Sequence, residues 1–153
     1  MSAALSKRRL KLWLRLLRTI RGAEGDLRAH LRSAHGTTLP RFDVMAALHR
    51  ARGPLTMTEL SRWLLVSNGN ATAVVDRLVA DGLVARQAAP GDRRAVRVAL
   101  TAAGAARFAQ LAVDHEAQVD RLFAALGPAE IEALGALLER LDRAGAPASE
   151  EVA

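Results

Sequence analysis

Arginines gather around a tight turn near residue 90, and their guanidinium groups are suited to binding phosphate. Pro90 and Gly91 are turn formers that separate a short incoming stretch from a strongly basic outgoing one. The charged residues of this region are four arginines and one acid: Arg86, Arg93, Arg94, Arg97 and Asp92. Such a projection fits the phosphates and the narrow minor groove of DNA, so double-stranded DNA is the expected partner. A solvated hairpin without a partner is the alternative.

The elements expected to position these arginines are two strands of a β-hairpin. The incoming strand is residues 83–87. The outgoing strand carries apolar residues at alternate positions, which places them on one face: Val96, Val98 and Leu100. Thr101 follows directly and can cap the next helix. The pattern therefore predicts a basic, two-stranded wing that leads into a helix.

A helix-turn-helix pattern comes directly before the wing. Residues 56–59 have the spacing of a capping box, which predicts a short helix there. A second helix is expected to begin at Ser67, a good N-cap, and to end at Gly82 in a left-handed conformation. Its first turn offers side chains that can reach base edges in a major groove: Asn68, Asn70 and Thr72. Arg77 is expected to contact a phosphate or to join a network with Asp76.

The two motifs together resemble the winged-helix repressors of the multiple-antibiotic-resistance-regulator (MarR) family. The resemblance is carried by "VSNGNATAVVDRLVADGLVARQ" and by "GDRRAVRVALTAAG", which holds a D-x-R wing signature at Asp92 and Arg94, and it extends over nearly all of the chain. It implies that Asp92 braces the wing and that Arg94 enters the minor groove. The full set of predicted DNA-binding residues is Ser67, Asn68, Asn70, Thr72, Arg77, Asp92, Arg93, Arg94 and Arg97.

The expected fold is mainly α, a winged helix-turn-helix with a two-stranded β wing and a helical dimerisation region. With 153 residues, the chain is expected to form one domain. Its parts are a domain of residues 1–145, with the helix-turn-helix and wing at 55–101 and dimerisation helices at 5–33 and 102–144, and a disordered tail at 146–153. Gly22 and Gly25 each weaken the first helix by about 1 kcal/mol relative to alanine, which predicts a bend or break there.

Glycine and proline also predict where other helices begin and end. Gly53 and Pro54 are expected to end the second helix. A helix of about seven turns is expected after the wing, ending near Gly127. Gly127, Pro128 and Glu130 suit the N-cap and first turn of a last helix.

Two apolar stripes exceed what a small winged helix needs for its own core. They run from Leu10 to Ile20 and from Ile131 to Leu141. The family resemblance implies that such terminal helices interlock two subunits into a two-fold homodimer, whereas burial within one chain is the alternative. Two-fold symmetry places the recognition helices about one DNA turn apart, roughly 34–36 Å, so the expected operator is an inverted repeat.

Composition limits the function classes. The net charge of +6 agrees with a polyanionic partner. The sequence contains no cysteine, which excludes thiolate chemistry. The chain has no uncharged apolar run of 18 residues and no secretory signal, so the cytoplasm is the expected compartment and no membrane span is expected. The histidines are scattered: His30, His35, His49 and His115. Neither catalytic residues, nor a metal site, nor a cofactor is therefore expected.

A competing class is a basic amphipathic protein that binds a membrane surface or nucleic acid without ligand control. The N-terminal stretch carries seven cations and no anion beside Trp13: Lys7, Arg8, Arg9, Lys11, Arg15, Arg18 and Arg21. The wing and the helix-turn-helix already explain a polyanionic partner. A dimerisation helix with a solvated basic face is therefore the favoured interpretation.

The family resemblance also implies a pocket between the dimerisation helices and the DNA-binding lobe, where a small organic anion lowers operator affinity. The candidate ligand-binding residues are Trp13, Arg15, Arg18, Ile20, Arg21, Phe42, Met45, Phe108 and His115. Ordinary core or surface placement is the alternative for each of them. Similarity to a subgroup that represses aromatic-acid catabolism implies an aromatic acid or its coenzyme A thioester as effector. The phosphates of the thioester would meet a cationic row beside Trp13, formed by Arg8, Lys11, Arg15 and Arg18.

Overall fold

The structure is a computed structural model in which residues 3–64 and 68–145 are described. It forms two compact units, residues 1–119 and 120–153, and the boundary falls in the last turn of a helix. Among the described helices, none is long and apolar enough to cross a membrane. The predictions for Ser67 and for a disordered tail at 146–153 concern positions outside the described residues.

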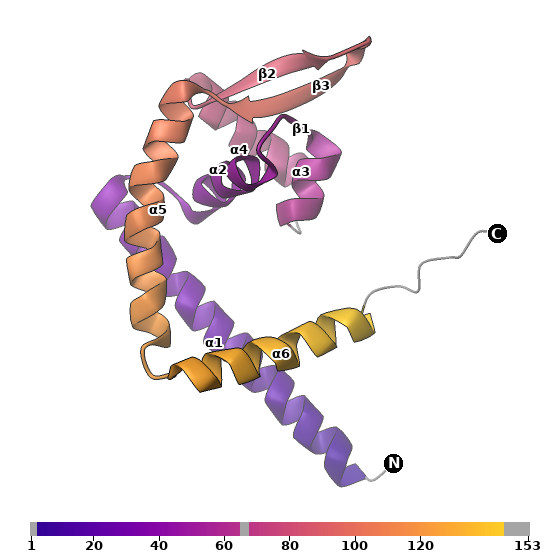
Figure 1. The fold of residues 1–153 in the computed structure, drawn as a ribbon, viewed down its shortest axis with the longest axis vertical. Helices are drawn as coiled ribbons and strands as arrows, with labels where there is room; N and C mark the ends of the chain where they lie inside the picture. The colour runs from indigo at the N-terminus through magenta and orange to yellow at the C-terminus, as the bar shows by residue number, and fades with distance from the viewer. Residues whose placement is uncertain (1–2, 65–67, 146–153) are drawn as a thin grey trace, which may run out of the picture. The chain divides into compact units, whose positions relative to one another are not determined.

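The architecture is the expected winged helix-turn-helix, mainly α with a small antiparallel sheet (Figure 1). In chain order the elements are α1 (Ala3–His35), α2 (Leu39–Ala51), β1 (Leu55–Thr56), α3 (Met57–Leu64), α4 (Asn68–Ala80), β2 (Val84–Ala89), β3 (Asp92–Leu100), α5 (Ala102–Phe123) and α6 (Pro128–Gly145). The β2–β3 hairpin extends beyond the helices α2 to α4 (Figure 1). The fold class predicted from the sequence is therefore confirmed.

The first helix corrects one prediction. It is continuous from Ala3 to His35, so the helix does not break at Gly22 and Gly25. Glycine lowers helix propensity but still donates and accepts the backbone hydrogen bonds of a helix. A cost of about 1 kcal/mol per glycine is offset by the many other hydrogen bonds of a 33-residue helix.

Two helix ends also differ from the prediction. The second helix ends at Ala51, because Arg52 adopts a left-handed conformation with φ 55° and its N–H donates to the carbonyl of His49. The helix therefore ends before Gly53 and Pro54. The helix after the wing ends at Phe123 rather than near Gly127. A residue other than glycine at a left-handed cap leaves little trace in the sequence.

The sheet that contains the wing has a third strand that the sequence did not indicate. The strand order is β1-β3-β2, and Leu55 and Thr56 pair with Val98 and Arg97. The β2–β3 hairpin is the predicted two-stranded wing, and β1 adds a short third strand to its sheet. Two residues are too few to show an alternating pattern, so their pairing depends on where the fold brings them. Gly91 forms the tip of the hairpin with φ 79°.

The core lies where α2, α3, α4, the sheet and α5 meet. Its largest fully buried side chains include Met45, Leu60, Leu78, Val98 and Leu111. Only the C-terminal end of α1 contributes a fully buried residue, Leu31. The N-terminal half of α1 and the face of α6 instead expose large apolar side chains: Leu10, Leu12, Trp13, Leu14, Ile20, Ile131, Leu137, Leu138 and Leu141.

Local hydrogen bonds fix the predicted helix starts. Thr56 and Glu59 form a reciprocal capping box, with Glu59 Oε2 accepting from the Thr56 N–H at 2.8 Å and Thr56 Oγ1 accepting from the Glu59 N–H at 3.2 Å. The first of these bonds is the main reason that the pKa of Glu59 lies below its usual range. Glu130 likewise accepts from the Gly127 N–H at 2.8 Å at the start of α6.

The junction between the wing and α5 is held by Thr101. Its hydroxyl donates to the carbonyl of Gly82 at 2.7 Å and accepts from the Gly104 N–H at 3.0 Å. The Thr101 N–H donates to the carbonyl of Leu83 at 3.1 Å. The start of α5 therefore lies directly against the turn that follows α4.

Gly104→Ala tests this close approach. A Cβ atom at Gly104 would overlap the carbonyl oxygen of Leu83, which is backbone and cannot move aside cheaply. We expect the substitution to lower the free energy of unfolding by about 1–3 kcal/mol, as overpacking does in tight cores. Gly25→Ala is the matched control, because nothing lies within 4 Å of its added Cβ, and it should stabilise the chain by up to about 1 kcal/mol. Urea unfolding of both variants measures the difference, and equal stability of the two would contradict the close approach.

Candidate DNA-binding interface and arginine-lined pocket

The fourth helix has a buried side and an exposed side. Ala71, Val75 and Leu78 are buried in the core. On the other side, three of the predicted DNA-binding residues are exposed: Asn70, Thr72 and Arg77. The side chains of Ser67 and Asn68 lie outside the described residues. The exposed side of α4 is therefore available to a partner, and the assignment of individual residues to DNA stays a prediction.

The helix ends in a geometry that leads straight into the wing. Gly82 adopts φ 72°, as predicted, and the N–H groups of Gly82 and Leu83 donate back to the carbonyls of Val79 and Leu78. This pattern is the Schellman motif, in which a left-handed residue closes the last helical turn. The first strand of the wing then begins two residues later, at Val84.

The tip of the wing carries two exposed arginines, Arg93 and Arg94. Asp92 Oδ1 accepts a hydrogen bond from the Arg94 N–H at 2.9 Å, which forms a local turn closed by the aspartate side chain. This bond restrains the backbone that carries the Arg94 side chain. The wing tip therefore presents two exposed arginines on a restrained backbone, a suitable arrangement for contact with a DNA groove.

Arg97 lies elsewhere than the tip arginines. It is half-buried at the base of the wing, where β3 pairs with Thr56 of β1. Its charge is one of the smaller reasons that the pKa of Glu59 is lowered, so it lies near the capping box of α3. The sequence places Arg97 only three residues from Arg94. Pairing with β1, a strand that the sequence did not predict, places Arg97 at the base of the wing while Arg94 is exposed at its tip.

Asp76 joins α4 to the wing through an ion pair with Arg86 of β2. In a helix-turn-helix the second helix, here α4, is termed the recognition helix. The sequence predicted either a phosphate contact or a network with Asp76 for Arg77; the ion pair of Asp76 is with Arg86, and the phosphate contact of Arg77 stays a prediction. Adjacent residues on a helix point in different directions, whereas a side chain on a neighbouring strand can face across the gap. Arg77 remains exposed and borders a pocket.

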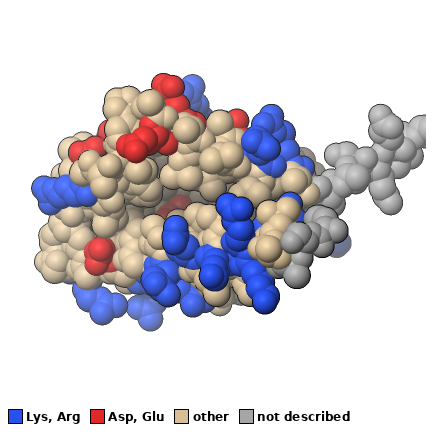
Figure 2. All heavy atoms as spheres, turned by 90° about the horizontal axis from the view of Figure 1, so that it is seen from below, with Lys and Arg blue, Asp and Glu red and all other residues tan. Residues whose placement is uncertain are grey.

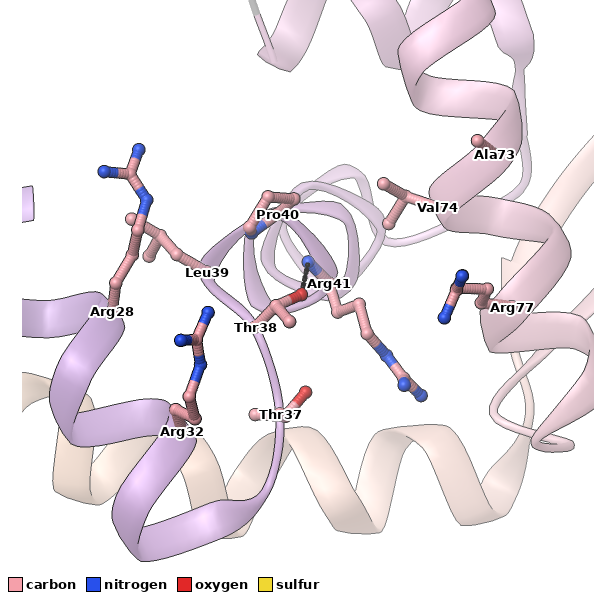
Figure 3. Close-up of a pocket in the computed structure, with 10 residues that line it drawn as sticks. All are labelled: Arg28, Arg32, Thr37, Thr38, Leu39, Pro40, Arg41, Ala73, Val74 and Arg77. Carbon is pink, nitrogen blue, oxygen red and sulfur yellow. Dashed lines mark hydrogen bonds between the residues drawn. The ribbon is translucent and has the colours of Figure 1, made fainter.

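That pocket has a volume of about 420 Å³ and lies between α1, α2 and α4 (Figure 3). Arg28 and Arg32 of α1 lie on one side, Arg77 of α4 lies on the other, and Arg41 extends between them (Figure 3). The lining residues are Arg28, Arg32, Thr37, Thr38, Leu39, Pro40, Arg41, Ala73, Val74 and Arg77. The volume falls within the usual range of small-molecule sites.

The pocket combines four guanidinium groups with an apolar floor and with two threonines. Arg41 is fixed by an ion pair with Asp81, and its buried Nε–H has no hydrogen-bond partner within the described residues. The N-terminus of α2, capped by Thr38, adds the positive end of a helix dipole. This arrangement is suited to a small organic anion whose carboxylate meets the arginines and whose body meets the floor.

None of the predicted ligand-binding residues lines this pocket. Phe42, Met45 and Phe108 are buried in the core. The His115 ring is half-buried and stacks on Phe42 with a centroid distance of 4.1 Å. The remaining candidates are exposed on α1: Trp13, Arg15, Arg18, Ile20 and Arg21. Their ligand contacts stay predictions, and no sequence pattern indicated that residues 28, 32, 41 and 77 line one pocket.

The sequence and the fold of the chain are both similar to those of known proteins. The family model described as "MarR family" matches residues 35–95. Wild-type MarR from E. coli in its apo form is 30% identical, with a TM-score of 0.68 over 83% of this chain and 94% of that one. The chain belongs to the MarR family. The chain is therefore of the class of winged-helix, DNA-binding transcriptional regulators.

Other MarR-family relatives extend the likeness. MhqR, a transcriptional regulator from Bacillus subtilis, is 28% identical over 90% of this chain and 93% of its own. A point mutant of E. coli MarR complexed with operator DNA is 28% identical, with a TM-score of 0.77 over 88% of this chain and 95% of that one. BpsR from Bordetella bronchiseptica, whose DNA binding is regulated by 6-hydroxynicotinic acid, is 26% identical with a TM-score of 0.75 over 86% of this chain and 91% of that one.

A second cavity of this MarR-family chain, of about 470 Å³, contains an unusual carboxyl group. Asp43 lines it together with Glu24 and Arg28. Desolvation is the main cause that raises the pKa of Asp43 to about 6, and the charge of Glu24 raises it further while Arg28 opposes. The residue as a whole is exposed, but its carboxyl group loses part of its hydration against the cavity wall.

Asp43→Asn tests that environment through pH. The wild-type carboxyl group is protonated in both states only well below the ordinary pKa of 3.8, and its ionisation weakens the folded state as pH rises from that value through about 6. We expect the variant to match the wild type at about pH 3 and to be more stable at pH 8, by no more than about 1 kcal/mol because solvent screens an exposed group. Chemical unfolding across this pH range measures it, with Asp26→Asn on α1 as the matched change of charge. A stability difference that does not change with pH would contradict the raised pKa.

Proposed function

We propose that this chain acts as a homodimeric transcriptional repressor that binds an inverted-repeat operator and is released by a small organic anion. The proposal goes beyond the family assignment in three respects: the dimer, the operator and the effector. The observation that carries it is the arginine-lined pocket, because one of its walls belongs to the recognition helix.

Binding to DNA is supported by the wing and α4 together. Arg93 and Arg94 project at the tip of a hairpin, and the Asp76–Arg86 ion pair ties that hairpin to α4. The net charge of +6 agrees with a polyanionic partner. Figure 2 views the molecule from below Figure 1, away from the wing, and there too Lys and Arg side chains gather on part of the face. E. coli MarR, which shares this fold, has been crystallised with operator DNA. Phosphate contacts and groove insertion are the chemistry that these groups offer.

The homodimer is supported by apolar surface that this chain leaves uncovered. The N-terminal half of α1 exposes Trp13 over 58% of its surface, and α6 exposes Ile131 and Leu141 over more than half of theirs. Apolar patches of this extent usually mark protein contacts in soluble proteins. A second copy of the chain offers the same apolar helices, and two-fold symmetry would place two α4 helices on successive turns of one DNA duplex.

Control by an anion is supported by the composition of the pocket walls. Arg28 and Arg32 belong to α1, which carries the uncovered apolar surface, whereas Ala73, Val74 and Arg77 belong to α4. A carboxylate that bridges Arg32 and Arg77 would favour one separation of these helices over others. A ligand shifts a conformational equilibrium by its difference in affinity for the two states, so operator affinity would fall if DNA requires another separation.

The effector class that fits is an aromatic acid. The apolar floor of Leu39, Pro40 and Val74 can pack against a ring, and the guanidinium groups can bind its carboxylate. A coenzyme A thioester is the second candidate, because its phosphates would meet the exposed cationic row of α1 at Arg15 and Arg18. The effector of the relative BpsR, 6-hydroxynicotinic acid, is itself an aromatic acid.

Arg94→Ala tests the operator proposal. Loss of a guanidinium group from the wing tip should weaken operator binding by about tenfold at fixed salt, the lower part of the range for a groove-bound arginine. Gel-shift titrations with an inverted repeat near the chain's own promoter measure the effect. Arg143→Ala, in the last turn of α6, removes the same charge far along the sequence and should bind like wild type. Equal affinity of the wild type for the inverted repeat and for random duplex would sink the proposal.

Arg32→Gln tests the effector site. Benzoates and hydroxycinnamates should release wild-type protein from its operator, and the variant should need about tenfold more acid, because a hydrogen bond to a charged group is worth about 1.5–3 kcal/mol. Arg15→Gln is the matched control on the exposed row of α1 and should respond like wild type. If thioesters alone cause release, and only Arg15→Gln reduces it, the effector site lies on the cationic row instead.

A further inference from the structure

We propose that His30, His35 and Asp114 form a binding site for a divalent transition-metal ion. Their candidate ligand atoms, two imidazole nitrogens and a carboxylate oxygen, all lie within 4.8 Å of one another. Both His30 Nε2 and His35 Nε2 face the same oxygen, Asp114 Oδ2, and the distance from His35 is 2.7 Å. The proposal does not depend on the proposed effector or operator.

The fold brings these residues together from two helices. His30 and His35 lie in the last turns of α1, and Asp114 lies in the middle of α5. The rings of His30 and His35 meet edge to face with a centroid distance of 6.0 Å. Arg107 of α5 donates to the carbonyl of His35 at 2.8 Å, so the end of α1 is held against α5 by a second contact. The ligand geometry thus rests on a supported junction.

The donor set indicates which metal ions fit. Imidazole suits zinc, copper, iron and nickel, whereas magnesium and calcium prefer oxygen ligands alone. Three protein ligands leave one tetrahedral position for water or a small anion, as in open zinc sites. Zn²⁺ is therefore the ion that the site fits best.

The exposure of the site permits entry from solvent. The side chains of His30, His35 and Asp114 are 26%, 19% and 36% exposed, so each is partly covered without being sealed. The guanidinium group of Arg107 is the nearby charge that opposes a cation, but its hydrogen bond is directed to a backbone carbonyl rather than to the carboxylate. A bound ion would join the end of α1 to α5, the helix that follows the wing directly.

The competing interpretation is a triad held by hydrogen bonds alone, with both histidines donating to Asp114. The two interpretations differ in metal uptake. The test uses the full chain freed of any affinity tag and treated with EDTA, which is then titrated with Zn²⁺ against a chromophoric chelator and, separately, with Co²⁺. We expect one ion per chain and Co²⁺ absorption bands of nitrogen and oxygen ligation. Zn²⁺ should also raise the Tm of the wild type, because an ion that binds only the folded state stabilises it.

Substitutions then locate the ion. His35→Gln and Asp114→Asn should each weaken Zn²⁺ affinity at least about tenfold, since even partners outside the coordination sphere act on this scale. His49→Gln is the matched control, because His49 is exposed on α2 and packs on Phe108 rather than on the cluster. Far-UV circular dichroism checks folding, and His30→Gln replaces any variant that does not fold. The absence of Zn²⁺ uptake by the wild type, or equal uptake by the cluster variants, would overturn the proposal.

Discussion

The close approach of α5 to the turn after α4 is the constraint on which the DNA-binding unit depends. Gly104 has no side chain, so α5 can begin directly against the carbonyl of Leu83, and Thr101 bridges both segments with its hydroxyl. The end of the recognition helix, both strands of the wing and the start of α5 therefore converge at one place. Hydrogen bonds of Thr101 thus join the start of α5 directly to the turn after α4.

Ion pairs then decide which arginines face a partner. Asp76 binds Arg86 and Asp81 binds Arg41, so two acids near the end of α4 hold one arginine of the wing and one of α2. The exposed guanidinium groups of Arg93 and Arg94 remain at the tip of the wing. The same residue type thus serves to brace the fold at some positions and to present positive charge at others. Arg41 and Arg86 are held by neighbouring carboxylates, whereas the exposed arginines of the wing tip present their charge to solvent.

The sequence predicted the elements best where a few neighbouring residues decide the outcome. The capping box of Thr56 and Glu59 and the left-handed Gly82 follow from residue types within one helical turn. The wrong predictions concern competition between local and distant effects. The glycines of α1 were expected to bend or break it, but the helix does not break, because the rest of a long helix outweighs their low propensity. The strand β1 exists because the fold places it beside β3.

The sequence by itself determined the fold class, because periodic apolar residues, caps and turn residues act over short distances along the chain. It also determined the basic wing, whose arginines and turn lie within a few consecutive residues. Only the tertiary structure decided which side chains meet across helices. Arg28 and Arg32 border a pocket with Arg77, and His30 lies beside Asp114 although 84 residues separate them. Such contacts depend on how α1 packs against α4 and α5, and residue spacing within one helix carries no record of that packing.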